Sequence, residues 1–226
     1  MNEGRATSDN QRERVAVIIP AYNEEDRIGQ VLEAVAKCSL VDEIIVVNDG
    51  STDKTAQIAS SYPVKLINRA QNGGKGAAMQ SGIKATAAQI LAFIDADLIK
   101  LTPKHLEDMI SPLISEGNIL MTVGKFKGGR LRTDLAQKIV PFISGQRVFR
   151  RSFLQGIPDF SRSGFGVEVV ITKHAKKIKA PVKEVILRDA SQVMKEEKLG
   201  FLKGFIRRLK MYKEILVHLL FPGRSW

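Results

Sequence analysis

Two carboxylates stand one residue apart near the middle of the chain, at the end of an apolar run. Asp95 and Asp97 follow the sequence ILAFI, and only Ala96 lies between them. Side chains alternate along a strand, so the two carboxylates start on the same face. Anions this close repel each other unless a cation lies between them, and a hard divalent ion with oxygen ligands is the simplest such cation. The competing interpretation is a polar loop in which both aspartates only cap the next helix.

Alternating strands and helices must position these carboxylates. The expected strands of the first hundred residues are 15–19, 43–47, 64–67 and 90–94, the first of them stopped by Pro20. The expected helices between them are 24–38, 51–60 and 74–86. This alternation is typical of a parallel sheet with helices on both faces. In such sheets, ligands bind beyond the carboxyl ends of the strands.

A polar segment follows each expected strand. The four segments are PAYNEE at 20–25, NDGSTD at 48–53, NGGKG at 72–76 and DAD at 95–97. Glycines allow a close approach of backbone to ligand, and Lys75 among them suits a phosphate, although the GxxxxGK[ST] loop is absent. Each of the first two segments alone is adequately explained as a turn and helix cap. Four of them at one sheet edge indicate a site.

The second half of the chain is less regular. The helices expected there are 103–116 and 166–177, with 134–143 as a further helical candidate. The expected strands are 119–123 and 182–187, and a basic glycine-rich loop is expected at 125–132. The histidines His105, His174 and His218 sit in helical patterns, which predicts structural or solvent-facing roles for them.

The net charge of +11 limits the classes of partner. Such an excess attracts nucleic acid, anionic lipid or phosphorylated small molecules. We expect no nucleic acid, because aromatic residues make up only 6% of the chain and the basic residues form no RNA-binding motif. The single cysteine, Cys38, is predicted to be a small buried residue and fits a reducing compartment. Residues 1–13 are predicted to be a polar tail without the apolar core of a signal peptide.

The last segment, residues 198–226, is predicted to be a separate basic amphipathic helix. Apolar residues of GFLKGFIRRLKMYKEILVHLLF gather on one side and Lys and Arg on the other. Such a helix can lie in an anionic membrane interface. It can also dock on the domain or pair two subunits in a homodimer, and we favour docking. The expected location is the cytoplasm, with peripheral attachment to the inner face of the cell membrane left open.

The four polar segments, in this order and spacing, resemble the family 2 glycosyltransferases with the GT-A fold. The matching runs are VAVIIPAYNEEDRI, EIIVVNDGSTDKT, NGGKGAAMQSGI and ILAFIDADL, which cover about residues 14–100. A weaker likeness continues from SGQRVFRRSFL onward. Within the family, the chain is similar to the polyprenyl-phosphate sugar transferases of the dolichyl-phosphate mannose synthase type and to the glucosyl-3-phosphoglycerate synthases.

The resemblance implies an α/β GT-A fold, which is Rossmann-like, with a mainly parallel central sheet and helices on both faces. One domain would cover residues 14–197, with 14–100 binding the nucleotide sugar and 101–197 binding the acceptor. The donor would be a nucleotide-diphosphate sugar, either a UDP-sugar or a GDP-sugar. The residues implied for its nucleotide are Pro20, Tyr22 and Glu24 around the nucleoside, Asp49 at the base or ribose, and Lys75 reaching toward it.

The resemblance also implies a metal site and a catalytic group. Asp95 and Asp97 would hold Mg²⁺ or Mn²⁺ against the diphosphate, and Asp97 would also be a catalytic residue. Several relatives add a histidine as third ligand, about 25 residues past a glutamate that corresponds to Glu168. Gln192 stands there in this chain, and its side-chain carbonyl can offer an oxygen to the metal.

The acceptor half carries two further predicted site residues. Arg147 of the SGQR segment is expected to bind phosphate, and Glu168 of GFGVE is expected to face the acceptor or sugar. A glutamate at a helix start is otherwise simply favourable to the helix dipole. Arg150 and Arg151 either join in phosphate binding or open a helix in solvent.

We favour a polyprenyl phosphate at the membrane surface as the acceptor. The alternative is a small soluble phosphorylated acceptor, as in the glucosyl-3-phosphoglycerate synthases. A hydroxyl acceptor needs a general base, for which Glu168 is the candidate. Whether the transfer inverts or retains configuration stays open. A nucleotidyltransferase and a non-enzymatic nucleic-acid-binding domain are lower-ranked alternatives.

Overall fold

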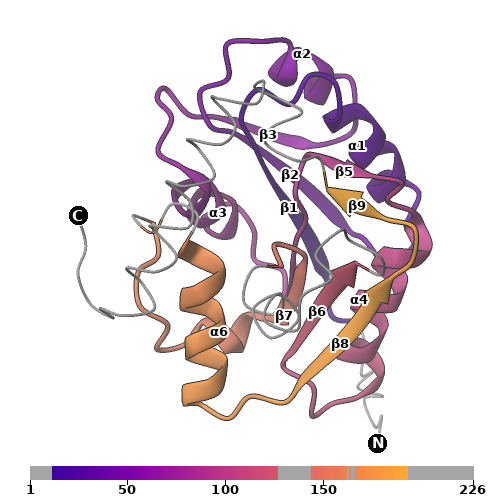
Figure 1. Cartoon of the computed structure of the whole chain (residues 1–226), viewed down its shortest axis with the longest axis vertical. Coiled ribbons are helices and arrows are strands. Elements are labelled where there is room, and N and C mark those ends of the chain that lie inside the picture. The colour runs from indigo at the N-terminus through magenta and orange to yellow at the C-terminus, as the bar shows by residue number, and fades with distance from the viewer. Residues whose placement is uncertain (1–11, 127–143, 162, 164–165, 193–226) are drawn as a thin grey trace, which may run out of the picture.

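The computed structural model describes residues 12–126, 144–161, 163 and 166–192. Its centre is a seven-stranded sheet with the order β3-β2-β1-β4-β7-β6-β8 (Figure 1). The strands are β1 (Val15–Ala21), β2 (Glu43–Asn48), β3 (Lys65–Asn68), β4 (Ile90–Phe93), β6 (Met121–Phe126), β7 (Arg147–Arg150) and β8 (Val182–Leu187). Only β7 pairs antiparallel with its neighbours, β4 and β6. The predicted α/β fold with a mainly parallel sheet is confirmed.

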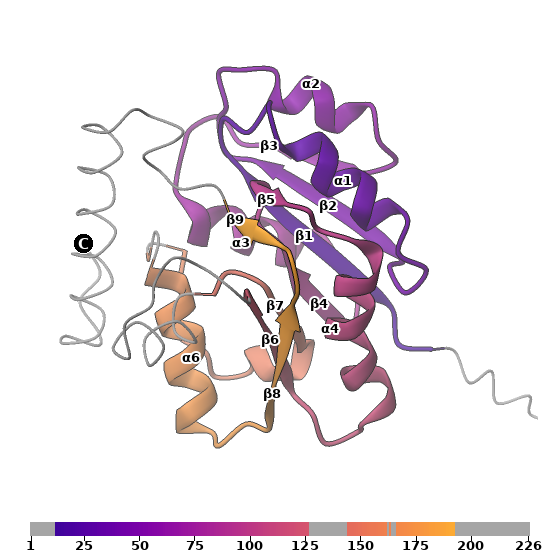
Figure 2. The same cartoon turned by 45° about the vertical axis from the view of Figure 1, so that its right-hand side comes forward.

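Helices cover both faces of this sheet. The helices on one face are α1 (Ile28–Ala36), α2 (Thr55–Ser60) and α4 (Pro103–Ser115), and those on the other are α3 (Lys75–Lys84) and α6 (Val167–Lys177) (Figure 2). Along β1, Val17 and Ile19 pack in the first layer, whereas Ala16 and Ile18 pack in the second. All four side chains are fully buried. A strand covered on both faces needs a continuous apolar run, which explains the sequence VAVII.

A second, small sheet lies beyond the carboxyl end of β4. It consists of β5 (Leu98–Ile99) and β9 (Ser191–Gln192), which pair antiparallel with Leu98 opposite Gln192. Residues nearly a hundred positions apart in the sequence therefore become backbone neighbours next to Asp97. The short 3-10 helix η1 (Arg151–Leu154) follows β7.

The expectation that Pro20 ends the first strand is wrong. The strand β1 continues through Pro20, which lies opposite Val47, to Ala21. In a parallel ladder, successive residues bond alternately to the two neighbouring strands. The Ile18 carbonyl accepts from Ile94 on the β4 side, so the missing N–H of Pro20 faces the same side, beyond the last paired residue of β4. A proline at this position therefore interrupts no hydrogen bond of the ladder.

Strand β7 is not among the predicted strands, and the only element considered for this segment is a helix start at Arg150 and Arg151. The four residues RVFR are too short to show a period, yet Val148 packs on one face of the sheet and Phe149 on the other. Other predicted segments lie wholly or largely outside the described residues: the tail 1–13, the loop 125–132, the helix 134–143 and the helix 198–226. Of these, Arg12 is described and pairs with Asp42, and Lys125 belongs to β6.

The described histidines and the cysteine serve the fold. The thiol of Cys38 is buried and unbridged. His105 completes a capping box with Thr102 at the start of α4. The ring of His174 bonds the Phe153 carbonyl through Nε2 at 3.0 Å. None of the helices in the described part of the chain has both the length and the apolar character that crossing a bilayer requires.

Helix α3 packs unusually close to β1, and this packing is testable. A Cβ added to Gly82 would lie 2.3 Å from Cγ2 of Ile18. Gly82→Ala is therefore expected to lower the free energy of unfolding by about 1–3 kcal/mol, measured by urea denaturation. Removing the opposing methyl with Ile18→Ala should make the double variant less unstable than the sum of the two single variants.

Gly117→Ala is the matched control, because nothing lies within 4 Å of a Cβ added there. Strict additivity of Gly82→Ala and Ile18→Ala would contradict the close approach.

Candidate active site

The polar segments that follow β1 and β2 are joined to each other. The side-chain oxygen Oδ1 of Asn23 accepts from the Thr52 amide at 2.9 Å, and the Asn23 amide donates to Oγ of Ser51 at 3.0 Å. Beside this contact the Tyr22 side chain remains 37% exposed. The joined segment contains the residues predicted to line a nucleoside: Pro20, Tyr22 and Glu24.

Asp49, at the carboxyl end of β2, organises the glycine loop that follows β3. Its carboxylate is 3% exposed and accepts from the amides of Gly73 and Gly74, the latter at 2.8 Å. The loop backbone needs glycine at 74, where φ is +85°. The guanidinium of Arg69 also binds Asp49. The structure thus shows Asp49 fixing the loop that precedes Lys75, while its predicted contact with a base or ribose stays a prediction.

The centre of the site is the ammonium of Lys75, the first residue of α3. Its Nζ lies 2.5 Å from Oδ1 of Asp95 and 2.6 Å from Oε1 of Glu168. The three side chains come from the start of α3, the end of β4 and the first turn of α6. They are largely buried, with exposed fractions of 14% for Lys75, 10% for Asp95 and 8% for Glu168. Burial alone lowers the pKa of Lys75, but the charges of Asp95 and Glu168 outweigh it and raise that pKa above its ordinary value.

Arg147 lies behind this centre, at the start of β7. It is 1% exposed, its Nε donates to the Ser144 carbonyl at 2.9 Å, and its Nη2 donates to Oγ1 of Thr172 at 2.9 Å. Burial lowers the pKa of Arg147 to about 10, although the charge of Glu168 acts in the opposite direction. Arg147 therefore ties β7 to α6 next to Glu168. Its predicted contact with an acceptor phosphate stays a prediction.

The backbone places the predicted metal ligands Asp95, Asp97 and Gln192 on two neighbouring segments. Asp95 is buried, Asp97 is half-buried two residues later, and Gln192 lies opposite Leu98 in the small sheet. Within the described ranges, no group of three His, Cys, Asp and Glu residues could hold a metal ion. A cation, the ammonium of Lys75, already contacts Asp95, so this carboxylate is placed to meet positive charge. Two carboxylates fit a hard divalent ion that completes its shell with water or ligand oxygens.

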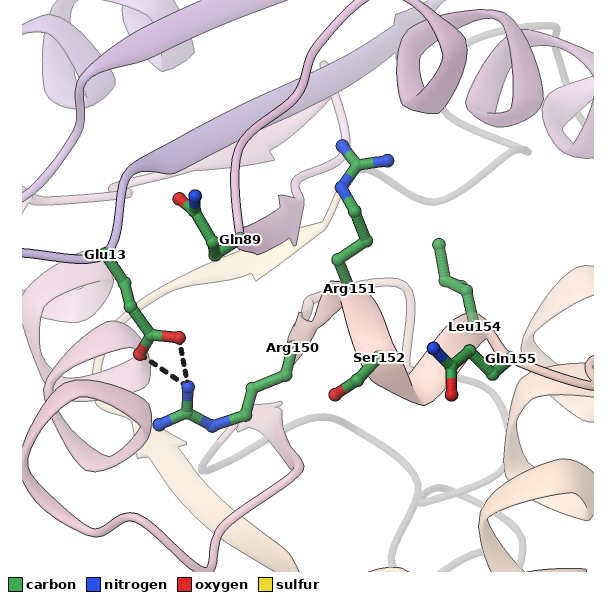
Figure 3. A pocket seen from close by; sticks show the side chains of 7 residues that line it. All are labelled: Glu13, Gln89, Arg150, Arg151, Ser152, Leu154 and Gln155. Carbon is green, nitrogen blue, oxygen red and sulfur yellow. Dashed lines mark hydrogen bonds and ion pairs between the residues drawn. The ribbon is translucent and has the colours of Figure 1, made fainter.

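Arg150 and Arg151 lie away from this centre, at the opposite edge of the sheet. Nη1 of Arg150 binds the Glu13 carboxylate at 2.5 Å, and Nε of Arg151 donates to the Ala88 carbonyl at 2.7 Å. The two guanidinium groups point apart in a pocket of about 500 Å³ that Gln89 also lines (Figure 3). The predicted phosphate role of this pair is therefore wrong for the site at Asp95. Of the alternative, the helix start is confirmed, because Arg150 caps η1 and Arg151 begins it, but both side chains bond to the protein and are not simply solvated.

Sequence reasoning overlooked two residues of the site, Arg69 and Gln146. Arg69 directly follows β3, so its place at the polar edge was the available signal. Gln146 is fully buried and its Nε2 donates to Oδ2 of Asp95 at 2.8 Å. It precedes the unpredicted strand β7, and without that strand the sequence offered no sign that it reaches Asp95.

Solved structures of glucosyl-3-phosphoglycerate synthase from Mycobacterium tuberculosis share this architecture. The complex with Mn²⁺, UDP and glucosyl-3-phosphoglycerate has a TM-score of 0.76 and 25% identity, and the match covers 92% of this chain and 79% of that chain. The complex with Mg²⁺ and UDP has a TM-score of 0.74 and 26% identity, with 92% and 78% covered.

Curated sequences point the same way. The glucosyl-3-phosphoglycerate synthase of Mycolicibacterium smegmatis is 29% identical over 189 residues, which is 69% of this chain and 61% of that protein. The 4,4'-diaponeurosporenoate glycosyltransferase of Staphylococcus aureus is 34% identical over 108 residues, or 46% of this chain and 29% of that protein. The chain thus spans less than two thirds of the length of these relatives. Residues 16–174, more than half of the chain, match the model of glycosyl transferase family 2, and the protein belongs to this family.

Proposed function

We propose that the protein transfers a hexose from a UDP-sugar to a small phosphorylated acceptor, with Mg²⁺ or Mn²⁺ as cofactor. The observation that carries this proposal is the buried cluster of Lys75, Asp95 and Glu168 at the carboxyl edge of the sheet. Ligands of open α/β sheets bind at this edge. The choice of UDP and of a small acceptor is supported by the glucosyl-3-phosphoglycerate synthases, whose solved complexes contain UDP and phosphoglyceric acid or its glucosylated product.

The donor nucleotide would lie across the loops after β1, β2 and β3. Tyr22 offers an exposed ring to the base, and the amides of the glycine loop lead into the N-terminus of α3. The positive end of a helix dipole and the adjacent Lys75 ammonium both favour a diphosphate there. In this arrangement Asp49 acts by holding the loop in place.

Asp95 and Asp97 are the residues that would hold the divalent ion, with Gln192 as a candidate for a third contact. When bound, such an ion neutralises the negative charge that develops on a departing nucleoside diphosphate. The protein's own contribution is to keep Asp95 oriented and to exclude water from it, since its side chain is 10% exposed.

In the transfer itself, an acceptor oxygen forms a bond to the anomeric carbon of the sugar. The bond from that carbon to the diphosphate oxygen breaks, and its electron pair leaves with UDP. A hydroxyl acceptor also loses a proton, and Glu168, which contacts Lys75 in the buried cluster, is the proposed base that accepts it. Glu168 is held by Lys75 on one side and is followed by Thr172, whose hydroxyl donates to its carbonyl at 2.8 Å.

The polyprenyl phosphate acceptor favoured on sequence grounds has less support than the small acceptor. Its basis is the basic amphipathic segment 198–226, which lies outside the described residues. Attachment to a membrane and a cytoplasmic location therefore remain predictions. Sedimentation with anionic vesicles, before and after deletion of residues 199–226, distinguishes a membrane element from a docked helix.

The direct test is a transfer screen with the purified chain. UDP- and GDP-sugars are incubated with Mn²⁺ or Mg²⁺ and either 3-phosphoglycerate or polyprenyl phosphate, and the glycosylated acceptor is identified by mass. We expect product with a UDP-sugar and 3-phosphoglycerate. Product with polyprenyl phosphate alone would contradict the small acceptor, and no release of nucleoside diphosphate with any donor would contradict the proposed function.

Asp97→Asn is expected to reduce transfer by at least about 100-fold, because a neutral amide holds a divalent ion less well than a carboxylate. The loss is measured as the rate of UDP release with saturating Mn²⁺, and circular dichroism checks that the fold persists. Asp108→Asn, on the exposed face of α4, is the matched control. Full activity in Asp97→Asn would remove this residue from the metal site.

Lys75→Met is expected to lower the free energy of unfolding by about 3–5 kcal/mol, because two buried carboxylates lose their shared cation. Chemical denaturation measures the change, and adding Glu168→Gln should recover part of it. Calorimetry should also record weaker UDP binding. Lys104→Met, which breaks an exposed pair with Asp108, is the control. An unaffected stability and UDP affinity in Lys75→Met would show that the cluster matters to neither.

A further inference from the structure

The segment that leads into β7 is hydrogen-bonded to Asp95. We propose that Gln146 is a positioning residue that fixes the orientation of the Asp95 carboxylate, turning Oδ2 inward and presenting Oδ1 to a cation. The inference rests on the proposed function in one respect, since it takes Asp95 to be part of the donor and metal site.

The evidence is a two-point contact from the Gln146 side chain to the backbone and the side chain of Asp95. Oε1 of Gln146 accepts from the backbone amide of Asp95 at 3.0 Å, and Nε2 of Gln146 donates to Oδ2 of Asp95 at 2.8 Å. Gln146 is fully buried, so water does not compete for either bond. The terminal torsion of an aspartate is otherwise broad and roughly two-fold. The two bonds together restrict that torsion to one arrangement.

Glutamine is well suited to this contact. Its amide carries a donor and an acceptor on one rigid plane, so it can serve the N–H and the carboxylate of the same residue at once. Only one orientation of the amide satisfies both partners, which fixes the assignment of its oxygen and nitrogen. Asparagine is one methylene shorter, and glutamate would place an oxygen against Oδ2.

Gly145, the residue before Gln146, leaves the space that the contact between Gln146 and Asp95 needs. A Cβ on Gly145 would lie 2.3 Å from Oδ2 of Asp95 and 2.6 Å from Nζ of Lys75. The backbone at 146 is itself held, because the Gly124 amide of β6 donates to the Gln146 carbonyl at 2.9 Å. Gly145 and Gln146 thus pack directly against the Asp95–Lys75 pair.

The consequence is that Asp95 has one oxygen committed to the protein and one directed at positive charge. Oδ1 is the atom that lies 2.5 Å from the Lys75 ammonium. Residues around a metal that orient its ligands commonly change metal affinity by about 10- to 100-fold when they are replaced. We expect an effect of this size at Gln146.

The first experiment uses Gln146→Met, which keeps the length of the side chain, adds no charge and removes both hydrogen bonds. The affinity for UDP in the presence of Mn²⁺, measured by calorimetry well below the melting temperature, should fall by about 10- to 100-fold. Thr122→Val is the matched control, since it removes one fully buried hydrogen bond, from Oγ1 to the Met109 carbonyl at 2.7 Å, on the neighbouring strand.

An affinity in Gln146→Met equal to that of the wild type would overturn the inference. So would an equal loss in Thr122→Val, because the effect would then be one of general stability.

A second measurement needs no ligand. Hydrogen exchange of the Asp95 amide, followed by NMR, should be faster by about tenfold or more in Gln146→Met and unchanged in Thr122→Val. Unchanged protection of the Asp95 amide in Gln146→Met would also overturn the inference, because Gln146 would then not hold that amide. If the wild type binds neither Mn²⁺ nor UDP, the proposed function fails, whereas the exchange of the Asp95 amide still decides whether Gln146 holds this carboxylate.

Discussion

The site depends on one buried cation, the ammonium of Lys75, shared by Asp95 and Glu168. Ions removed from water need compensating charge and hydrogen bonds, and here each ion is within 2.6 Å of an opposite one. The contact joins the first hundred residues of the chain to a later segment, because Asp95 and Lys75 precede residue 100 and Glu168 lies in the first turn of α6. Any movement between these two parts of the chain would therefore separate charges whose side chains are at most 14% exposed.

The reversed strand β7 makes this arrangement possible. Because β7 runs antiparallel to β4, it starts where β4 ends, with Arg147 opposite Phe93. Residues 145 and 146, just before the strand, consequently lie against Asp95. The other end of β7 leads to Arg150 and Arg151, which anchor the strand at the far edge of the sheet. The seven residues 145–151 thus contribute to the site at one end and to stability at the other.

Family membership supports the donor side of the proposed function more broadly than the acceptor side. The segments that follow β1, β2, β3 and β4 match the family pattern, and they surround the place where a nucleotide sugar is expected. The relatives differ in acceptor, since one is named for phosphoglycerate and another for diaponeurosporenoate. The donor side of the proposed function therefore has broader support than the acceptor side.

The sequence by itself determined the parallel core and the four polar segments at one edge, and it singled out Asp95 and Lys75, which the structure places together in the candidate site. These features are encoded locally, because strand runs, glycine loops and paired carboxylates are visible within a few residues. Only the tertiary structure decided that Lys75 pairs with Asp95 and Glu168, that Arg147 is buried, and that Gln146 supports Asp95. Such contacts join residues 20 to 93 positions apart, and the strand β7 that lies beside them, RVFR, is too short to carry a period of its own. Pairing across the sheet, which no local pattern specifies, fixed their places.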